Sequence, residues 1–168
     1  MTQAVPATGI ELLLLAAMRK ALPAAILVTG HRATLRAAAR RTRLLRCLMI
    51  DDNPQFLDAA RRLLEQGGIT VVGIGASGEE AVRLAGELRP DVTLVDIELG
   101  GENGVAITRH LAQLETAPAG KLILISTHAE DEFAELIESS PAIGFLPKAT
   151  LSARAVYALT DADRERHP

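Results

Sequence analysis

The stretch DVTLVDIELGGENG, residues 91–104, decides the fold because it joins an apolar strand to a glycine-rich loop and puts a carboxylate at the junction. Apolar residues dominate 91–97 and predict a strand, whereas residues 100–104 predict a tight loop. Asp96 therefore stands at the carboxyl end of a strand. In doubly wound parallel sheets, ligands gather at that edge.

Strands and helices alternate along the rest of the chain from residue 44 onward. Asn53 and Pro54 open the first helix as its cap and its first residue. Ser77 caps the second helix, with Glu80 three positions on. Further strands are predicted at 44–50, 69–74, 122–125 and 143–146, and further helices at 105–114, 130–138 and 151–159. This alternation predicts an α/β fold in which a five-stranded, doubly wound parallel sheet is flanked by five helices.

Polar side chains follow four of the predicted strands, at the point where each strand ends. They are Asp51 and Asp52, Asp96, Ser126 with Thr127, and Lys148. Because the carboxyl ends of parallel strands meet at one edge, these groups are expected to converge in a shallow cleft. Clustered carboxylates repel one another, and their oxygen atoms suit Mg²⁺. An ammonium and a hydroxyl beside them favour phosphoryl transfer, which depends on positioning and charge neutralisation.

Taken singly, these residues also have simpler interpretations. Asp51 and Asp52 can be a helix-capping pair, and Asp96 can be a turn residue. The hydroxyl can come from Ser126 or Thr127, and the register favours Ser126 because the apolar run stops just before it. The agreement of all the strand ends favours a site over these separate interpretations.

Four segments, in this order, resemble the response-regulator receiver family: LMIDDN (48–53), DVTLVDIELGGENG (91–104), LILISTH (122–128) and GFLPK (144–148). Ser126 and Lys148 follow Asp96 by 30 and 52 residues, and these separations agree with those of the family. The resemblance covers residues 44–160. It implies the flavodoxin-like fold that receivers share.

The resemblance also assigns a role to each strand-end residue. It implies Asp96 as the phosphoacceptor, Asp51, Asp52, Asp96 and Glu98 as the residues that hold Mg²⁺, Ser126 and Lys148 as the phosphoryl contacts, and Ser126 with Phe145 as the switch pair. Phe145 can equally be an ordinary core ring. Thr127 and His128 are secondary candidates, and His128 is otherwise interpreted as a surface loop histidine.

By the same resemblance, the chain is a phosphorylation switch of two-component signal transduction. It is expected to accept a phosphoryl group from a sensor histidine kinase or a phosphotransfer protein in the cytoplasm. It would catalyse its own Mg²⁺-dependent phosphorylation and dephosphorylation without otherwise being an enzyme. The surface formed by residues 130–159 would then change for docking of a downstream effector protein, for phosphorelay, or for a phosphorylation-dependent homodimer.

Two other functions remain open from the residues alone. The first is a non-phosphorylated, receiver-like protein-interaction module with a vestigial acidic cleft. The second is a nucleotide- or flavin-binding enzyme, suggested by the loose glycine pattern GIGASG at 73–78. That pattern follows the second strand without an acidic partner for a ribose, and a lone match of this kind is weak.

The chain departs from the family pattern in two loops. Gly100 stands where receivers usually carry a proline, which predicts a more flexible loop and looser metal binding. Ala149, rather than proline, follows Lys148 and leaves the isomer of that bond open. Some receivers linked to helix-turn-helix outputs also lack that proline.

Composition bounds the organisation of the 168 residues. Residues 1–46 hold eight basic residues and one acidic residue, a charge of +7, whereas the remainder holds ten against twenty, a charge of −10. We therefore expect a basic and apolar extension at 1–43, helical or disordered, a receiver domain at 44–160 and a charged tail at 161–168. With no output domain after the receiver, no direct nucleic-acid binding is expected, whether the receiver stands alone or belongs to a longer regulator.

Charged residues, cysteine and large aromatic rings limit the kinds of membrane segment, covalent or metal site, and core that the chain can form. The apolar run at 10–28 is broken by Arg19, Lys20 and Pro23, so no membrane span is predicted. Cys47 is the sole cysteine, which excludes an internal disulfide and a cysteine-based zinc cluster, and its apolar surroundings predict burial. Large rings are scarce, so any ring near the strand ends is of interest; they are Phe56, Phe133, Phe145 and Tyr157.

Overall fold

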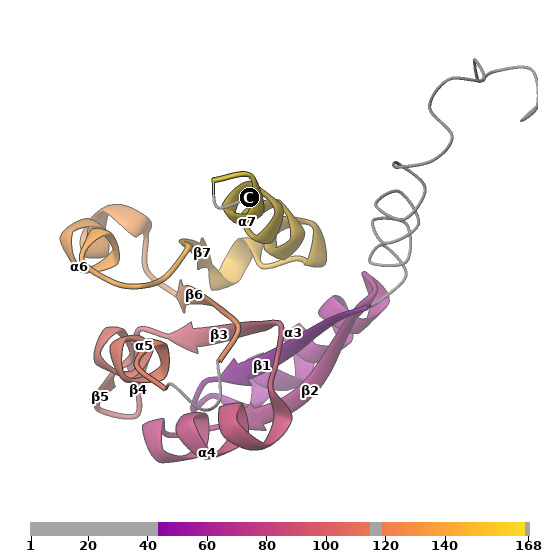
Figure 1. The fold of residues 1–168 in the computed structure, drawn as a ribbon, viewed down its shortest axis with the longest axis horizontal. Coiled ribbons are helices and arrows are strands. Elements are labelled where there is room, and N and C mark those ends of the chain that lie inside the picture. Colours follow the sequence, from indigo (N-terminus) through magenta and orange to yellow (C-terminus); the bar gives the residue numbers. More distant parts are fainter. Residues whose placement is uncertain (1–43, 115–118, 167–168) are drawn as a thin grey trace, which may run out of the picture. The chain divides into compact units, whose positions relative to one another are not determined.

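Five parallel strands form one sheet in the order β2-β1-β3-β6-β7 (Figure 1). Their bounds are β1 (Leu45–Ile50), β2 (Ile69–Gly75), β3 (Val92–Asp96), β6 (Lys121–Ser126) and β7 (Gly144–Pro147). The computed structural model describes residues 44–114 and 119–166. The chain order reverses direction between β1 and β3, so this sheet has its topological switch point there. The predicted doubly wound fold is confirmed.

Alternating side chains along the strands divide the apolar interior into two clusters. On β1, Cys47 and Met49 join one cluster, whereas Leu48 and Ile50 join the other. The first cluster is closed by α3 (Pro54–Gln66) and α7 (Ala153–Arg166), and the second by α4 (Gly78–Leu88), α5 (Gly104–Ala112) and residues of α6 (Ala134–Glu138). Each fully buried aliphatic side chain contributes about 1.5–3 kcal/mol. Two cores on one sheet hold the strand ends in fixed register.

Side chains cap the first two helices after β1 and β2. The Asn53 side chain accepts a hydrogen bond from the Phe56 amide at 3.1 Å, as the sequence predicted. The Ser77 hydroxyl accepts from the Glu80 amide at 3.2 Å. The Glu80 carboxylate reaches the amide of Ala76 rather than that of Ser77, so the expected capping box closes one residue early. These caps fix the loops that leave the carboxyl edge of the sheet.

The glycine-rich segment after β3 is a β-hairpin with a tight turn, as expected for 100–104, whereas the greater flexibility and looser metal binding expected there stay predictions. Strands β4 (Glu98–Leu99) and β5 (Glu102–Asn103) pair antiparallel around Gly100 and Gly101. These two glycines have φ values of 55° and 92°, the positive values that a two-residue hairpin turn requires. Gly104 then donates its amide to the Ile97 carbonyl at 2.8 Å, and a Cβ there would overlap the Asp96 carbonyl oxygen. The hairpin therefore folds back tightly onto the end of β3.

Two helices differ from their predicted bounds by more than two residues at one end. The helix expected at 130–138 begins as the 3₁₀ turn η1 (Glu130–Phe133) before α6. Helix α7 extends to Arg166, well into the residues predicted as a charged tail. Lys121 explains this extension, because its Nζ lies 2.7 Å from Asp163 Oδ2 and donates to the Thr160 carbonyl at 2.7 Å. The polar end of α7 is thus bound to the start of β6.

Two further expectations concern burial and the membrane. Cys47 is fully buried, as predicted, and burial raises the pKa of its thiol to about 12. Within 44–114 and 119–166, no helix has the length and apolar character needed to cross a bilayer. The apolar run at 10–28 and the basic extension at 1–43 lie outside the described residues, so those expectations stay predictions.

Candidate functional site

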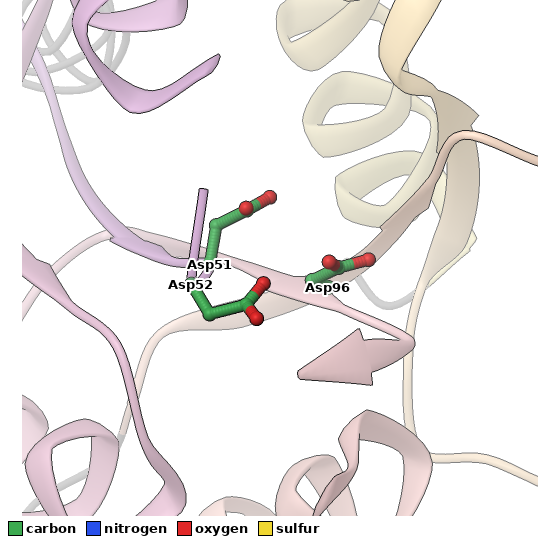
Figure 2. Close-up of side chains that lie close together, drawn as sticks. All are labelled: Asp51, Asp52 and Asp96. Atoms are coloured by element: carbon green, nitrogen blue, oxygen red, sulfur yellow. The ribbon is translucent and has the colours of Figure 1, made fainter. Parts of the chain in front are cut away.

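Three carboxylates meet at the switch point of the sheet (Figure 2). Asp51 and Asp52 follow β1, and Asp96 ends the neighbouring strand β3. One oxygen from each lies within 4.8 Å of the others. Asp51 and Asp96 are buried, whereas Asp52 is exposed. The sequence predicted this convergence from the strand ends alone.

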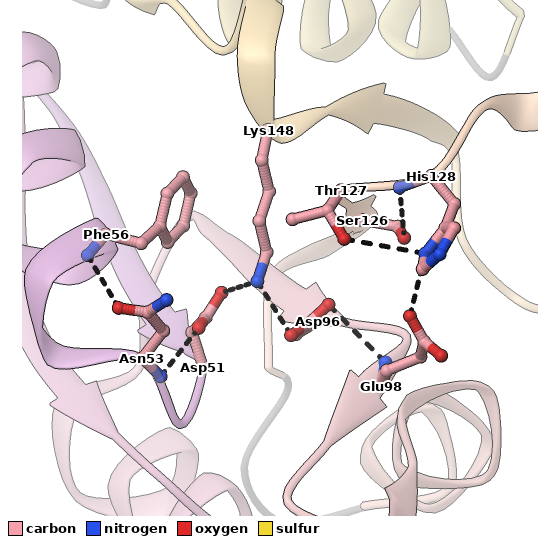
Figure 3. A network of polar contacts seen from close by, with 9 residues as sticks. All are labelled: Asp51, Asn53, Phe56, Asp96, Glu98, Ser126, Thr127, His128 and Lys148. Atoms are coloured by element: carbon pink, nitrogen blue, oxygen red, sulfur yellow. Dashed lines mark hydrogen bonds and ion pairs between the residues drawn. The ribbon is translucent and has the colours of Figure 1, made fainter.

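Lys148 binds two of these carboxylates (Figure 3). Its Nζ lies 2.6 Å from Asp51 Oδ2 and 2.8 Å from Asp96 Oδ2, and its side chain is 10% exposed. The lysine follows β7 in the 3₁₀ turn η2 (Lys148–Thr150), and no peptide bond in the described residues is cis. One ammonium against three carboxylates leaves the cluster with excess negative charge.

The free oxygen atoms of the cluster fit a hard cation. Asp51 Oδ1 accepts a hydrogen bond from the Asn53 amide at 2.9 Å, but Asp51 Oδ2 is buried and has the charge contact with Lys148 without a hydrogen bond. Asp96 Oδ1 has only a long hydrogen bond, 3.4 Å, from the Glu98 amide. Carboxylate oxygens with spare capacity, one of them open to solvent, are the ligands that Mg²⁺ and Ca²⁺ use. Asp51, Asp52 and Asp96 can therefore bind a metal ion.

Burial and nearby charges have opposite effects on the pKa values of Asp96 and Lys148. The pKa of Asp96 is raised, chiefly by burial and further by the charge of Asp51, although the hydrogen bond and the charge of Lys148 lower it. Burial alone would lower the pKa of Lys148, but its contacts with Asp51 and Asp96 outweigh this and raise it. The ammonium thus stays charged, while Asp96 is a more basic carboxylate than one in water.

The end of β6 supplies one buried and one exposed hydroxyl. Ser126 is fully buried, and its Oγ accepts a hydrogen bond from the His128 amide at 3.0 Å. Thr127 is exposed, with its Oγ1 at 3.4 Å from His128 Nδ1. Asp96 pairs with Ile125 in the sheet, so Ser126 lies one residue beyond the register of Asp96. This burial agrees with the preference for Ser126 over Thr127.

His128 is a surface histidine that nevertheless has defined partners. Its Nδ1 lies 2.9 Å from Glu98 Oε2, and its ring meets Phe133 edge to face with centroids 6.0 Å apart. The contact with Glu98 joins the loop after β6 to the hairpin after β3 (Figure 3). The sequence did not predict it, because the two residues are thirty positions apart and carry no local pattern.

Two aromatic rings come from elements that lie next to site residues in the chain. Phe145 is buried in the second core cluster, where it pairs with Leu124 in the sheet, so an ordinary core packing role is satisfied. Phe56 lies with its ring centroid 4.8 Å from Lys148 Nζ (Figure 3). No role at the site was predicted for Phe56. The scarcity of large rings in the chain was the one signal that singled it out.

A groove in the described residues lies away from the carboxylates. It has a volume of about 710 Å³ and is lined by residues of α4, α5 and the hairpin, including Val82, Ile107 and His110. Glu102 at its rim accepts hydrogen bonds from the Gly78 amide at the start of α4. None of the clustered carboxylates lines it. A phosphoryl group needs charged contacts rather than an apolar enclosure, so the shallow cluster remains the candidate site.

A flavodoxin-like sheet with an acidic cluster and a lysine at its switch point defines the class of receiver-like α/β domains. Residues 47–159 match the family model described as the response regulator receiver domain, and the chain belongs to this family. It therefore contains a receiver domain of two-component systems. The expected family and fold are both confirmed.

Curated relatives and solved structures give the same assignment. Response regulator GacA of Pseudomonas viridiflava is 33% identical over 117 residues, 69% of this chain and 54% of that protein. Transcriptional regulatory protein LiaR of Bacillus subtilis is 30% identical over 122 residues, 72% of this chain and 57% of that protein. A two-component response regulator of the LuxR family from Aurantimonas sp. has a TM-score of 0.63 and 30% identity, over 71% of this chain and 87% of its own. The receiver domain of NarL from Mycobacterium tuberculosis has a TM-score of 0.63 and 28% identity, over 70% and 97%.

The chain spans about half the length of these curated relatives. One of them is named a transcriptional regulatory protein. The expectation that this chain makes no direct contact with nucleic acid therefore finds no support in its relatives.

Proposed function

We propose that Asp96 accepts a phosphoryl group from the phosphohistidine of a sensor histidine kinase or a phosphotransfer protein. The observation that carries this proposal is the geometry at the switch point. Asp96 ends β3 as a buried carboxylate with an ammonium 2.8 Å from Oδ2 and two further carboxylates within 4.8 Å. Membership of the receiver family supports the same role. A kinase donor of this type implies a cytoplasmic location for the chain.

The transfer needs few steps from the protein. An Asp96 oxygen attacks phosphorus, a new O–P bond forms, and the N–P bond to the donor imidazole breaks as that nitrogen takes up a proton. The Lys148 ammonium would move from carboxylate to phosphoryl oxygen and neutralise part of its charge. Ser126 would donate its hydroxyl to another phosphoryl oxygen once it is released from the His128 amide.

The acidic residues would hold Mg²⁺ beside the phosphoryl group. Asp51, Asp52 and Asp96 are the side-chain ligands in this proposal, and Glu98 would contribute its backbone carbonyl. The bound ion supplies positive charge that balances the carboxylates and the arriving phosphoryl oxygens. Transfer from small phosphodonors and later hydrolysis would then be catalysed by the chain itself.

The response would be a shift between two conformations of the domain. Ser126 ends β6, and Phe145 lies on the neighbouring strand β7 opposite Leu124, two residues before Ser126, so movement of the hydroxyl towards phosphate would alter the packing of the ring. The surface of α6, β7 and α7 would change with it. That surface would dock a downstream effector, pass phosphate along a relay, or pair two phosphorylated chains.

Intact-mass analysis tests the phosphoacceptor directly. The wild-type chain is incubated with phosphoramidate or acetyl phosphate in Mg²⁺, and one acid- and base-labile phosphoryl adduct is expected. Asp96→Asn should abolish the adduct, whereas Asp58→Asn, which alters an exposed carboxylate of α3, should leave it unchanged. An adduct that survives in Asp96→Asn would refute the assignment. No adduct in the wild-type chain, together with no Mg²⁺ binding, would favour the non-phosphorylated interaction module instead.

A further inference from the structure

The Lys148 ammonium lies over the ring of Phe56 as well as against two carboxylates (Figure 3). The ring centroid is 4.8 Å from Nζ, while Asp51 Oδ2 and Asp96 Oδ2 are at 2.6 and 2.8 Å. The lysine comes from the turn after β7 and the ring from the first turn of α3. Three elements of the fold therefore fix the position of one nitrogen atom.

The loop that carries the acidic pair also sets the ring. The Asn53 amide donates to Asp51 Oδ1 at 2.9 Å, and the Asn53 side chain accepts from the Phe56 amide at 3.1 Å. Pro54 fixes the backbone between them as the first residue of α3. The carboxylate and the ring are thus positioned by the same cap. A shift of one would move the other.

The ring acts on the ammonium in two ways. Its face is electronegative and attracts a cation within about 6 Å of the centroid. It also excludes water from part of the surroundings of Nζ, which agrees with the 10% exposure of the Lys148 side chain. Lysine is otherwise a point charge on a flexible four-carbon stem. The ring therefore narrows the positions that the ammonium occupies without competing for its contacts with the two carboxylates.

We propose that Phe56 is a positioning residue that holds the Lys148 ammonium in place for phosphorylation of Asp96. The inference rests on the proposed phosphoacceptor function and deepens it. In this proposal Phe56 acts through Lys148 and not on the phosphoryl group or the metal ion. Phe56 also packs against the first core cluster, so its structural contribution has to be separated from its effect on the lysine.

Three variants and two measurements make that separation. Phe56→Leu keeps an apolar side chain and removes the ring face, Phe56→Tyr keeps the face, and Leu57→Val is a matched change in a buried neighbour on α3. The first measurement is the NMR shift of the Lys148 Hε protons, which a ring face moves upfield without any phosphodonor. The second is the phosphorylation rate with phosphoramidate at saturating Mg²⁺. Midpoints of unfolding are recorded for every variant.

We expect upfield-shifted Hε protons in wild type and Phe56→Tyr and unshifted protons in Phe56→Leu. Phosphorylation of Phe56→Leu should be about fivefold slower, the size of one cation–π contact, and should recover in Phe56→Tyr. Leu57→Val should keep the wild-type rate at the same temperature although it is less stable. In a Lys148→Ala background, Phe56→Leu should have no further effect on the remaining rate.

Contrary results distinguish the role of Phe56 from the role of Asp96 as phosphoacceptor. A wild-type rate in Phe56→Leu, or unshifted Hε protons in the wild-type chain, would overturn the role of Phe56 and leave the phosphoacceptor intact. A slow Phe56→Tyr that keeps the upfield shift would overturn it as well. Failure of the wild-type chain to form any adduct would refute the phosphoacceptor itself, and the role of Phe56 in phosphorylation with it.

Discussion

Replacing Lys148 by methionine should destabilise the domain strongly in the absence of divalent cations. The ammonium faces Asp51 Oδ2 at 2.6 Å and Asp96 Oδ2 at 2.8 Å, with both carboxylates buried. At an effective dielectric constant of about 20, each attraction is about 6 kcal/mol. Desolvation of the three ions offsets much of this, and measured losses on breaking a buried ion pair are about 3–5 kcal/mol. We expect Lys148→Met to lose a similar amount.

Urea unfolding followed by circular dichroism, with EDTA present, measures this loss. Lys121→Met is the matched control, because Lys121 pairs with the single carboxylate of Asp163 and both side chains are about one-fifth exposed. That variant should lose about 1 kcal/mol. Adding Asp96→Asn to Lys148→Met should restore part of the stability, since it removes one of the three clustered carboxylates left to repel one another.

Two results would refute this account of the cluster. The first is a loss in Lys148→Met no larger than that in Lys121→Met, which would mean that solvent already screens the site. The second is a further loss on adding Asp96→Asn, which would mean that Asp96 contributes packing or hydrogen bonds rather than repulsion. Either result would also weaken the case that a cation is needed there.

Three further predictions concern the metal, the thiol and the hairpin. Mg²⁺ should stabilise the folded chain by about 2.7 kcal/mol at 100 times its dissociation constant, and so raise the midpoint of thermal unfolding. Asp52→Asn should remove most of that stabilisation but change the stability of the metal-free protein little, because Asp52 is exposed. Equal stabilisation of the variant and the wild-type chain by Mg²⁺ would contradict the site. Cys47 should resist a disulfide reagent at pH 8 in the folded chain and react fully in urea, because burial raises the pKa of its thiol to about 12. Fast reaction of the folded chain would show that β1 opens. Gly104→Ala should lower the free energy of unfolding by about 3 kcal/mol, because its Cβ would overlap the Asp96 carbonyl oxygen. Gly101→Ala should lower it by about 1 kcal/mol, because its Cβ meets open space and only the φ of 92° is unfavourable. Equal losses in urea unfolding would argue against the tight return of the hairpin.

Much of the site could be predicted because a parallel sheet converts order along the chain into proximity. Asp51, Asp96 and Lys148 each follow a strand, and the strand order follows from the connections, so no side-chain detail was needed to bring them together. The caps at Asn53 and Ser77 were predictable for a similar reason. Each depends on a few adjacent residues whose bonding choices are limited.

The contacts that escaped prediction lie between segments that carry no shared pattern. Glu98 and His128 meet because a hairpin and a loop bend towards each other, and neither bend is encoded by hydrophobic periodicity. Gly100 and Gly101 were interpreted as flexibility, although a pair of positive φ values is equally what a two-residue turn demands. Helix α7 extended past its apolar residues because Lys121, far away in sequence, binds its polar end.

The lysine links the stability of the domain to its proposed chemistry. In the unphosphorylated chain, Lys148 is the neutralising partner of both Asp51 and Asp96, so moving it to a phosphoryl group leaves Asp51 without its counter-charge. A cation at Asp51 and Asp52 would remove that cost, which is a reason for phosphorylation to require Mg²⁺ that does not depend on the cation touching the donor. On this argument, Asp51→Asn should reduce Mg²⁺ affinity and also lower the Mg²⁺ dependence of the phosphorylation rate, because the carboxylate that needs neutralising is gone. A Mg²⁺ dependence as steep as that of the wild-type chain would place the requirement on the phosphoryl oxygens instead.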